Sequence, residues 1–252
     1  MKHLCAGLLG MAAILPTAAA ARDYCPTRPS LGQSACTIDT GRVAIETALS
    51  DWERDSDADT VLFGDTLFRL GVADRVELQV EWTPAGVVRD RMTGDRTARS
   101  GDVELGARIA LRNPDGMGLS YGLRPSVSVP AGRSPIGMGG WGAALVAPMS
   151  YDLTDKLNLQ FSPEIATMPR EDRGGNMTVA TATLGLGIML GDKCQLAVEG
   201  QWSHDDMATE HRAGLAVGWQ LSDDLFVDAG GVAGLDHDTP ALRIYSGLSR
   251  RF

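Results

Sequence analysis

The stretch Arg75-Val-Glu-Leu-Gln-Val-Glu-Trp82 alternates strictly between polar and apolar side chains. In an extended chain, the apolar residues at even positions lie on one face and the polar residues at odd positions on the other. Because successive side chains of a strand point to opposite faces, this pattern predicts a β-strand with one apolar and one polar face. The same alternation recurs over residues 101–112, 157–165 and 212–221.

Twelve segments of this kind follow one another from Gly41 to the C-terminus, so the predicted fold class is all-β. Short turns and longer polar loops alternate between them, and the longest expected loop covers Thr83–Ser100. An even number of strands with this alternation is typical of an antiparallel up-and-down barrel in the outer membrane, with both chain ends on the periplasmic side. A secreted β-sandwich or soluble barrel is the alternative, but its strands usually have about 5–6 residues, too few to cross a bilayer. The expected strands cover residues 41–52, 59–70, 75–84, 101–112, 118–130, 140–151, 156–167, 177–190, 194–203, 210–221, 225–235 and 241–252.

Composition excludes two other classes. The 252 residues include 23 Lys and Arg against 32 Asp and Glu, a formal charge of −9, with no basic tract. Nucleic-acid binding needs clustered cations to displace phosphate counterions, so no nucleic-acid partner is expected. After residue 21 no apolar run reaches the roughly 18 residues of a membrane-spanning helix, which excludes a helical membrane protein.

The N-terminal region divides into two parts ahead of the barrel at residues 41–252. Residues 1–21 have the polar start, apolar core and small-residue end of a cleaved signal peptide, with a membrane anchor as the alternative. Residues 22–40 are then a periplasmic N-terminal segment. Export allows a disulfide between Cys25 and Cys36, the alternative being a mobile tail with free thiols, and Cys194 is left over.

The C-terminal residues Tyr245-Ser-Gly-Leu-Ser-Arg-Arg-Phe252 are similar to the terminal assembly signal of bacterial outer-membrane proteins. The resemblance lies in Tyr245, Gly247 and the final Phe252, whereas Arg250 occupies a position that is usually apolar. It implies that the barrel assembly machinery is a partner of the chain, in addition to outer-membrane lipid. A terminal phenylalanine on a soluble domain is the alternative.

Several short motifs together resemble the transporter family named for the MetA pathway of phenol degradation. They are Phe68-Arg-Leu-Gly-Val-Ala-Asp-Arg-Val-Glu-Leu78, Gly101-Asp-Val-Glu-Leu-Gly106, Val127-Ser-Val-Pro-Ala-Gly132 and the C-terminal residues 239–252. The resemblance covers most of the chain after residue 41 and implies a barrel of the bacterial outer membrane that passes small compounds, including aromatic ones. The preference for uncharged solutes is expected instead from the balanced charges of the lumen, described next. The segment with Cys25 and Cys36 is not part of it.

The polar face of the strands is expected to line the lumen. It carries nine acidic residues and nine arginines, and such matched sets usually form ion pairs in a confined space. These pairs either brace the barrel or take part in solute selection, and their balance predicts weak ion selectivity. The candidate lumen residues are Arg42, Glu46, Asp65, Arg69, Arg75, Glu77, Glu81, Asp102, Glu104, Arg108, Arg112, Arg124, Glu164, Glu199, Arg212, Asp228, Arg243 and Arg251.

Small residues dominate the inward face of four other strands and leave room either for a solute or for arginines from the charged wall. We therefore expect a passive channel for small solutes, with a non-conducting structural or surface-interaction barrel as the alternative. An enzyme is disfavoured. A catalytic serine and histidine must lie on the same face of a strand, but Ser203 and His204 are adjacent and point to opposite faces. No cofactor is implied. Acidic and histidine residues at 204–211 and 236–238 could bind a cation, but solvated loop tips are the simpler interpretation.

Overall fold

The computed structural model describes residues 22–170 and 174–252, and the segment expected to be a signal peptide lies outside this range. In the described part of the chain every regular element is a strand, and no helix is long and apolar enough to cross a membrane. The strands are β1 (Val43–Arg54), β2 (Ala58–Phe63), β3 (Thr66–Ala73), β4 (Val76–Trp82), β5 (Ala85–Asp90), β6 (Arg96–Arg99), β7 (Val103–Arg112), β8 (Leu119–Val129), β9 (Gly142–Val146), β10 (Met149–Thr154), β11 (Leu157–Pro169), β12 (Asn176–Met189), β13 (Cys194–His204), β14 (Thr209–Ser222), β15 (Leu225–Gly234) and β16 (Leu242–Arg251).

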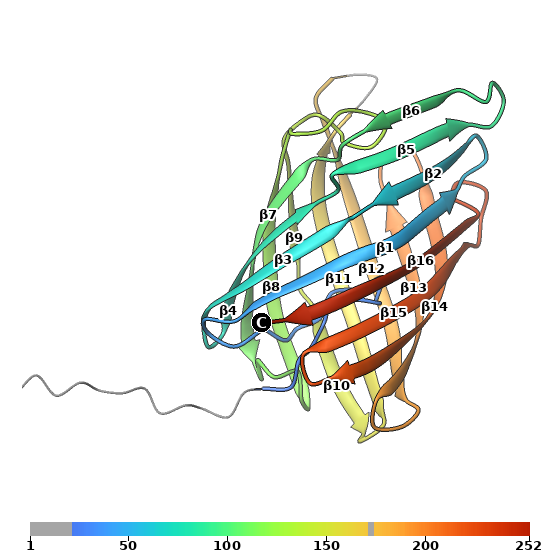
Figure 1. Ribbon diagram of the computed structural model, residues 1–252. Helices are drawn as coiled ribbons and strands as arrows, with labels where there is room; N and C mark the ends of the chain where they lie inside the picture. Colours follow the sequence, from blue (N-terminus) through green and yellow to red (C-terminus); the bar gives the residue numbers. More distant parts are fainter. Residues whose placement is uncertain (1–21, 171–173) are drawn as a thin grey trace, which may run out of the picture.

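These elements form one closed antiparallel barrel of twelve continuous strands (Figure 1). Four of the twelve are interrupted by short irregularities: β2 with β3, β4 with β5, β6 with β7, and β9 with β10. β2 and β3 both pair with β1, and β9 and β10 both pair with β8 and β11. β5 and β4 pair with β2 and β3, and β6 and β7 pair with β5 and β4, so each interrupted strand follows the next one along its length. Pairing of β16 with β1, from Ala44 opposite Arg251 to Arg54 opposite Leu242, closes the ring and confirms the predicted fold class.

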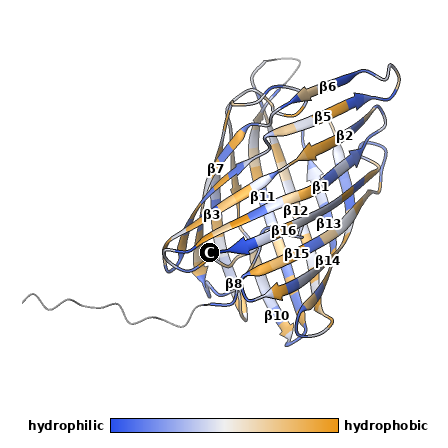
Figure 2. Cartoon of the chain, in the orientation of Figure 1, coloured by the Kyte–Doolittle hydropathy of each residue, from blue (hydrophilic) through white to orange (hydrophobic). Residues whose placement is uncertain are grey.

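The outer surface of the barrel is apolar where the inner surface is polar. On β4 the outward Leu78 and Val80 are 48% and 39% exposed, whereas the inward Glu77 and Gln79 are 0% and 2% exposed. Apolar and polar residues alternate in this way along most strands (Figure 2). A broad belt of exposed apolar side chains around a barrel without free edges is suited to lipid contact, so the protein is an outer-membrane β-barrel.

The expected loop Thr83–Ser100 is largely a hairpin. Residues 85–90 and 96–99 form β5 and β6, which extend the barrel wall beyond the neighbouring strands (Figure 1). Their sequence lacks a continuous apolar face. Outside the hydrocarbon layer a strand needs no such face, because backbone hydrogen bonds to its neighbours hold it in place. Polarity alone therefore made this segment look like a loop.

The N-terminal segment, residues 22–40, lies inside the barrel rather than outside it in the periplasm. It runs across the lumen at the end that carries the C-terminus, where Arg251 Nη1 donates to the Arg22 carbonyl at 2.6 Å. We call residues 22–40 the plug. Several backbone N–H groups of the plug donate to side chains of the inner wall. The sequence shows only that this segment does not alternate, so it does not reveal these contacts.

Closure of the barrel makes a direct prediction about its migration on denaturing gels. A ring with no free strand edge should resist detergent until it is heated. Unboiled protein is expected to migrate as a compact band ahead of boiled protein. Identical migration of both samples, with the protein in the soluble fraction, would contradict the membrane barrel.

Candidate functional site

The candidate lumen residues occupy three levels of the barrel. Those at the level of the plug are all buried: Glu46, Arg69, Glu77, Arg108, Glu199 and Asp228. Those nearer the β5–β6 end are Asp65, Glu81, Asp102, Glu104, Arg124, Glu164, Arg212 and Arg243, and most of them are half-buried. At the end that carries the C-terminus, Arg42 and Arg251 both pair with Asp224. Arg75 and Arg112 are exposed at the rim, because β4 begins after Arg75 and the β7–β8 register shifts just before Arg112.

Four charged side chains from adjacent strands form a buried chain of ion pairs. Arg69 on β3 contacts Glu46 on β1 at 2.6 Å and Glu77 on β4 at 2.9 Å. Arg108 on β7 approaches the same Glu77 at 3.5 Å, and all four side chains are 0% exposed. Because the charges alternate in sign, each arginine lies next to a carboxylate that compensates its burial.

A glutamine extends this chain of charges toward the β5–β6 end. The Gln79 side-chain amide donates to Glu77 at 2.6 Å, and its oxygen accepts from Arg124 Nε, also at 2.6 Å. Arg124 then pairs with Glu104 at 2.5 Å and, less closely, with Glu81 at 3.4 Å. Charge alone does not identify Gln79 as a lumen residue, because its side chain is neutral.

The plug is held mainly by carboxylates that accept from its backbone. Glu46 accepts from the N–H groups of Thr27 and Arg28, at 2.9 and 3.1 Å. Glu199 on β13 accepts from the N–H of Leu31 at 2.9 Å, and Glu77 accepts from that of Ile38 at 2.9 Å. Hydrogen bonds to charged acceptors contribute about 1.5–3 kcal/mol each, so the acidic wall serves as a docking surface for the plug.

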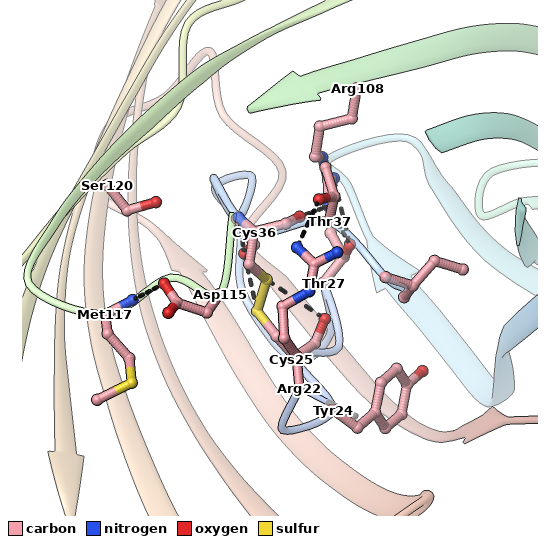
Figure 3. Close-up of a disulfide and its surroundings, with 12 residues drawn as sticks. Arg22, Tyr24, Cys25, Thr27, Cys36, Thr37, Arg108, Asp115, Met117 and Ser120 are labelled. Atoms are coloured by element: carbon pink, nitrogen blue, oxygen red, sulfur yellow. Dashed lines mark hydrogen bonds between the residues drawn. A yellow bond between two sulfur atoms is a disulfide. The ribbon is translucent and has the colours of Figure 1, made fainter. Parts of the chain in front are cut away.

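Two arginines of the same wall also hold the plug, through its carbonyl groups. Arg69 donates to the Cys25 carbonyl at 2.8 Å, and Arg108 donates to the Cys36 carbonyl at 3.3 Å. The structure contains a Cys25–Cys36 disulfide, which closes the plug into a loop at these two points. Figure 3 shows the Arg108 guanidinium directed at Thr27 and Cys36, next to the disulfide. The ion pairs thus brace the wall and seat the plug together.

The small inward residues leave space that is taken by the plug and by the rings of Tyr245 and Phe226. A Cβ at Gly214 would lie 3.1 Å from Leu31 of the plug. One at Gly230 would collide with the Tyr245 ring, whose hydroxyl donates to the Pro29 carbonyl at 2.7 Å. Arg28, not an arginine of the wall, fills the space above Gly247.

A bulge on β1 moves two further acidic residues into the lumen. The β1–β16 register shifts between Ala48 and Ser50, so side chains after this point change face. Asp51 is 2% exposed and pairs with Arg243, and Glu53 lies 3.6 Å from Arg212. Strict alternation from Arg42 and Glu46 would direct Asp51 outward, and Glu53 lies beyond the expected strand 41–52. No turn residue in this stretch marks the bulge.

The half of the lumen between the plug and the β5–β6 end is strongly acidic, and we call it the outer chamber. Among the described residues, eight carboxylates face three arginines there, so the overall balance expected from the sequence does not hold locally. The loop after β8 folds over this chamber, because Asp102 accepts from the N–H groups of Gly132 and Gly139 at 2.8 and 3.0 Å. The carboxylates are Asp51, Glu53, Asp65, Glu81, Asp102, Glu104, Glu164 and Glu210, and the arginines are Arg124, Arg212 and Arg243.

The histidine and acidic residues of the loops at that end form a local hydrogen-bond cluster. His211 Nδ1 lies 2.7 Å from Asp236, which also accepts from the Thr239 hydroxyl. The Thr239 hydroxyl and then His211 hold the pKa of Asp236 down to about 2. Within the described residues, no group of three or more His, Cys, Asp or Glu side chains is arranged to hold a metal ion.

Comparison with known proteins agrees with this geometry. The profile of the family described as "Putative MetA-pathway of phenol degradation" matches residues 27–252, which include the barrel and most of the plug. The chain belongs to this family. No curated protein matches the chain.

Solved structures with the same fold are outer-membrane barrels. The COG4313 outer membrane channel from Pseudomonas putida F1 superposes with a TM-score of 0.67 at 14% identity, over 86% of this chain and 98% of that one. The NanC porin gives a TM-score of 0.57 at 10% identity, over 82% and 98% of the two chains. The KdgM porin, in complex with disordered oligogalacturonate, gives 0.52 at 11% identity, over 83% and 99%. At these identities the likeness establishes the barrel fold.

Removing the disulfide should loosen the plug of this family member. Replacing both Cys25 and Cys36 by Ser frees a loop whose closure is worth about 3 kcal/mol of chain entropy. In planar bilayers we therefore expect more frequent openings to a larger conductance. A dithiol reductant should reproduce the effect in the wild type and leave the double variant unchanged. Equal opening frequencies in both proteins would show that the carboxylate contacts alone hold the plug.

Proposed function

We propose that the protein is a passive outer-membrane channel for small, mostly uncharged solutes, whose plug limits passage. The observation that carries the proposal is the construction of the lumen. Small residues line much of its wall, cavities lie on both sides of the plug, and the plug is attached through polar contacts rather than an apolar core. A barrel with a purely structural role would be expected to fill its interior with its own side chains.

The non-conducting structural barrel remains the second candidate, and the buried ion pairs around Arg69 and Arg108 favour it. They hold the plug at many points, and a plug that never leaves its seat would close the lumen permanently. The two functions differ in a measurable property, because only a channel carries ions and solutes.

Conductance in planar bilayers, combined with liposome swelling, tests the proposed channel. We expect a small ionic current and swelling with neutral single-ring compounds and small sugars. Reversal potentials should show a preference for cations, because carboxylates outnumber arginines in the outer chamber. Neither current nor swelling, from protein that is correctly inserted, would favour the structural barrel.

Assembly is expected to depend on Phe252, although the side chain is 53% exposed. Phe252 ends the strand that closes the barrel, and its N–H donates to the Val43 carbonyl of β1 at 2.7 Å. Deleting Phe252 should lower the amount of protein in the outer membrane and leave protein in the periplasm. Tyr245 and Gly247 have a second role, since both contact the plug, so their substitution would not isolate an assembly signal. Normal insertion of the Phe252 deletion would contradict this proposal.

A further inference from the structure

A second cavity, of about 260 Å³, lies between the plug and the wall formed by β11 to β15. We call it the inner chamber. On the plug side it is lined by residues 24–30 and Ser34. On the wall side its main residues are Gln160, Gly187, Met189, Gln195, Gln220 and Phe226. It lies nearer the end of the barrel that carries the C-terminus, on the other side of the plug from the outer chamber.

Three glutamine side chains from three strands reach this chamber. Gln160 precedes Ser162 by two residues on the lumen face of β11, and Gln195 shares the lumen face of β13 with Glu199. Gln220 on β14 pairs with Phe226 on β15. None of the three amides makes a side-chain hydrogen bond to another described residue, in contrast to Gln33, Gln79 and Gln201. Each therefore has two donors and one acceptor available to a bound molecule.

The inner chamber also differs from the outer chamber in charge. No carboxylate lines it. Arg28, which does line it, is paired with Asp228 at 3.1 Å, and Lys193 lies in the exposed turn between β12 and β13. A cation entering the chamber would lose water without gaining a counter-charge, and that loss is costly. An anion would meet only the ammonium of Lys193, which is exposed and screened by solvent, because Arg28 is already paired. The chamber therefore favours neutral molecules.

Apolar surface completes the lining. Met189, Phe226 and the two prolines of the plug at positions 26 and 29 face the cavity. The Phe226 ring packs directly against Gly218, where a Cβ would lie only 2.4 Å from it. The volume is just below the range of about 300–1,000 Å³ that is usual for drug-sized ligands, so the chamber suits a molecule of one ring or similar size.

We propose that the inner chamber is a binding site for a small neutral solute that combines an apolar ring or chain with hydroxyl or carbonyl groups. The glutamine amides bind the oxygens, and Phe226 and Met189 contact the apolar part. This inference rests on the proposed channel function and names the class of solute that pauses beneath the plug before it leaves.

Filling the chamber provides the sharpest test. Gly187 lines the cavity, and a Cβ there meets no atom closer than 3.7 Å, so Gly187→Leu is the variant chosen to fill it. Gly200→Leu is the matched control, because Gly200 lies on the exposed outer face of the next strand and a Cβ there meets nothing within 4 Å. Both variants should migrate like the wild type on heat-modifiability gels.

The probes are benzyl alcohol, benzylammonium and benzoate, which share one ring and differ in charge. Interruption of the ionic current in planar bilayers, and saturation-transfer NMR of protein in lipid nanodiscs, report binding independently. Benzyl alcohol should bind the wild type and Gly200→Leu about tenfold more tightly than either charged probe. Gly187→Leu should lose this binding. Retained binding by Gly187→Leu, or equal binding of a charged probe, would overturn the site.

A glutamine variant tests the role assigned to the amides. In Gln195→Leu the preference for benzyl alcohol over toluene should fall, while binding of toluene is kept. An unchanged preference would contradict hydrogen bonding by Gln195. Because the NMR measurement needs no current, a barrel that binds benzyl alcohol without conducting would support the site and refute the channel, and conduction without binding would do the reverse.

Discussion

Deleting residues 23–39 is expected to raise the single-channel conductance several-fold, with long-lived openings. The deletion removes the backbone donors that Glu46, Glu77 and Glu199 accept from, and the carbonyls that Arg69 and Arg108 contact. Water then replaces the plug around these side chains and opens a continuous polar path through the lumen. Recording in planar bilayers at fixed salt measures the effect.

The barrel itself should survive this deletion, because residues 22–40 contribute no strand to the ring. Heat-modifiable migration of the deleted protein is the control for correct folding. An unchanged conductance in a correctly folded barrel would place the constriction elsewhere, with the loop that Asp102 holds over the outer chamber as the next candidate.

Replacing Glu77 by Gln is expected to destabilise the protein by about 3–5 kcal/mol, as breaking a buried ion pair usually does. Glu77 pairs with Arg69 and Arg108 and accepts from the Ile38 N–H of the plug. Without its charge, Arg108 keeps no carboxylate partner among the described residues, and the plug loses a strong acceptor. The midpoint of urea unfolding, followed by tryptophan fluorescence, should fall, and plug openings should become more frequent.

Glu81→Gln is the matched control, with the same chemical change on the same strand. The Glu81 side chain is 40% exposed, and its partner Arg124 keeps the closer contact with Glu104 at 2.5 Å. We expect a loss of less than about 1 kcal/mol, as for exposed ion pairs. Equal losses for both variants would show that the charges around Glu77 are as hydrated as those of the outer chamber.

The barrel could be predicted from the sequence because its cause is local. A strand with one face toward lipid and one toward water must alternate, as residues 75–82 do, and the alternation repeats often enough to count the strands. Where that cause is absent, alternation predicts nothing: β5 and β6 lie beyond the apolar belt, and their sequence indicates a loop. The bulge near Leu49, which turns Asp51 and Glu53 inward, left no mark in the sequence either.

Alternation by itself therefore determined the fold, the closed topology and the polar character of the lumen. Only the tertiary structure decided what that lumen contains. Residues 22–40 have no periodic pattern, and their position depends on partners that are distant along the chain, such as Asp228 for Arg28 and Glu199 for Leu31. Closing the ring brings these groups together. Asp228 and Glu199 then have their partners on the plug, so the surface that binds the plug exists only in the folded barrel.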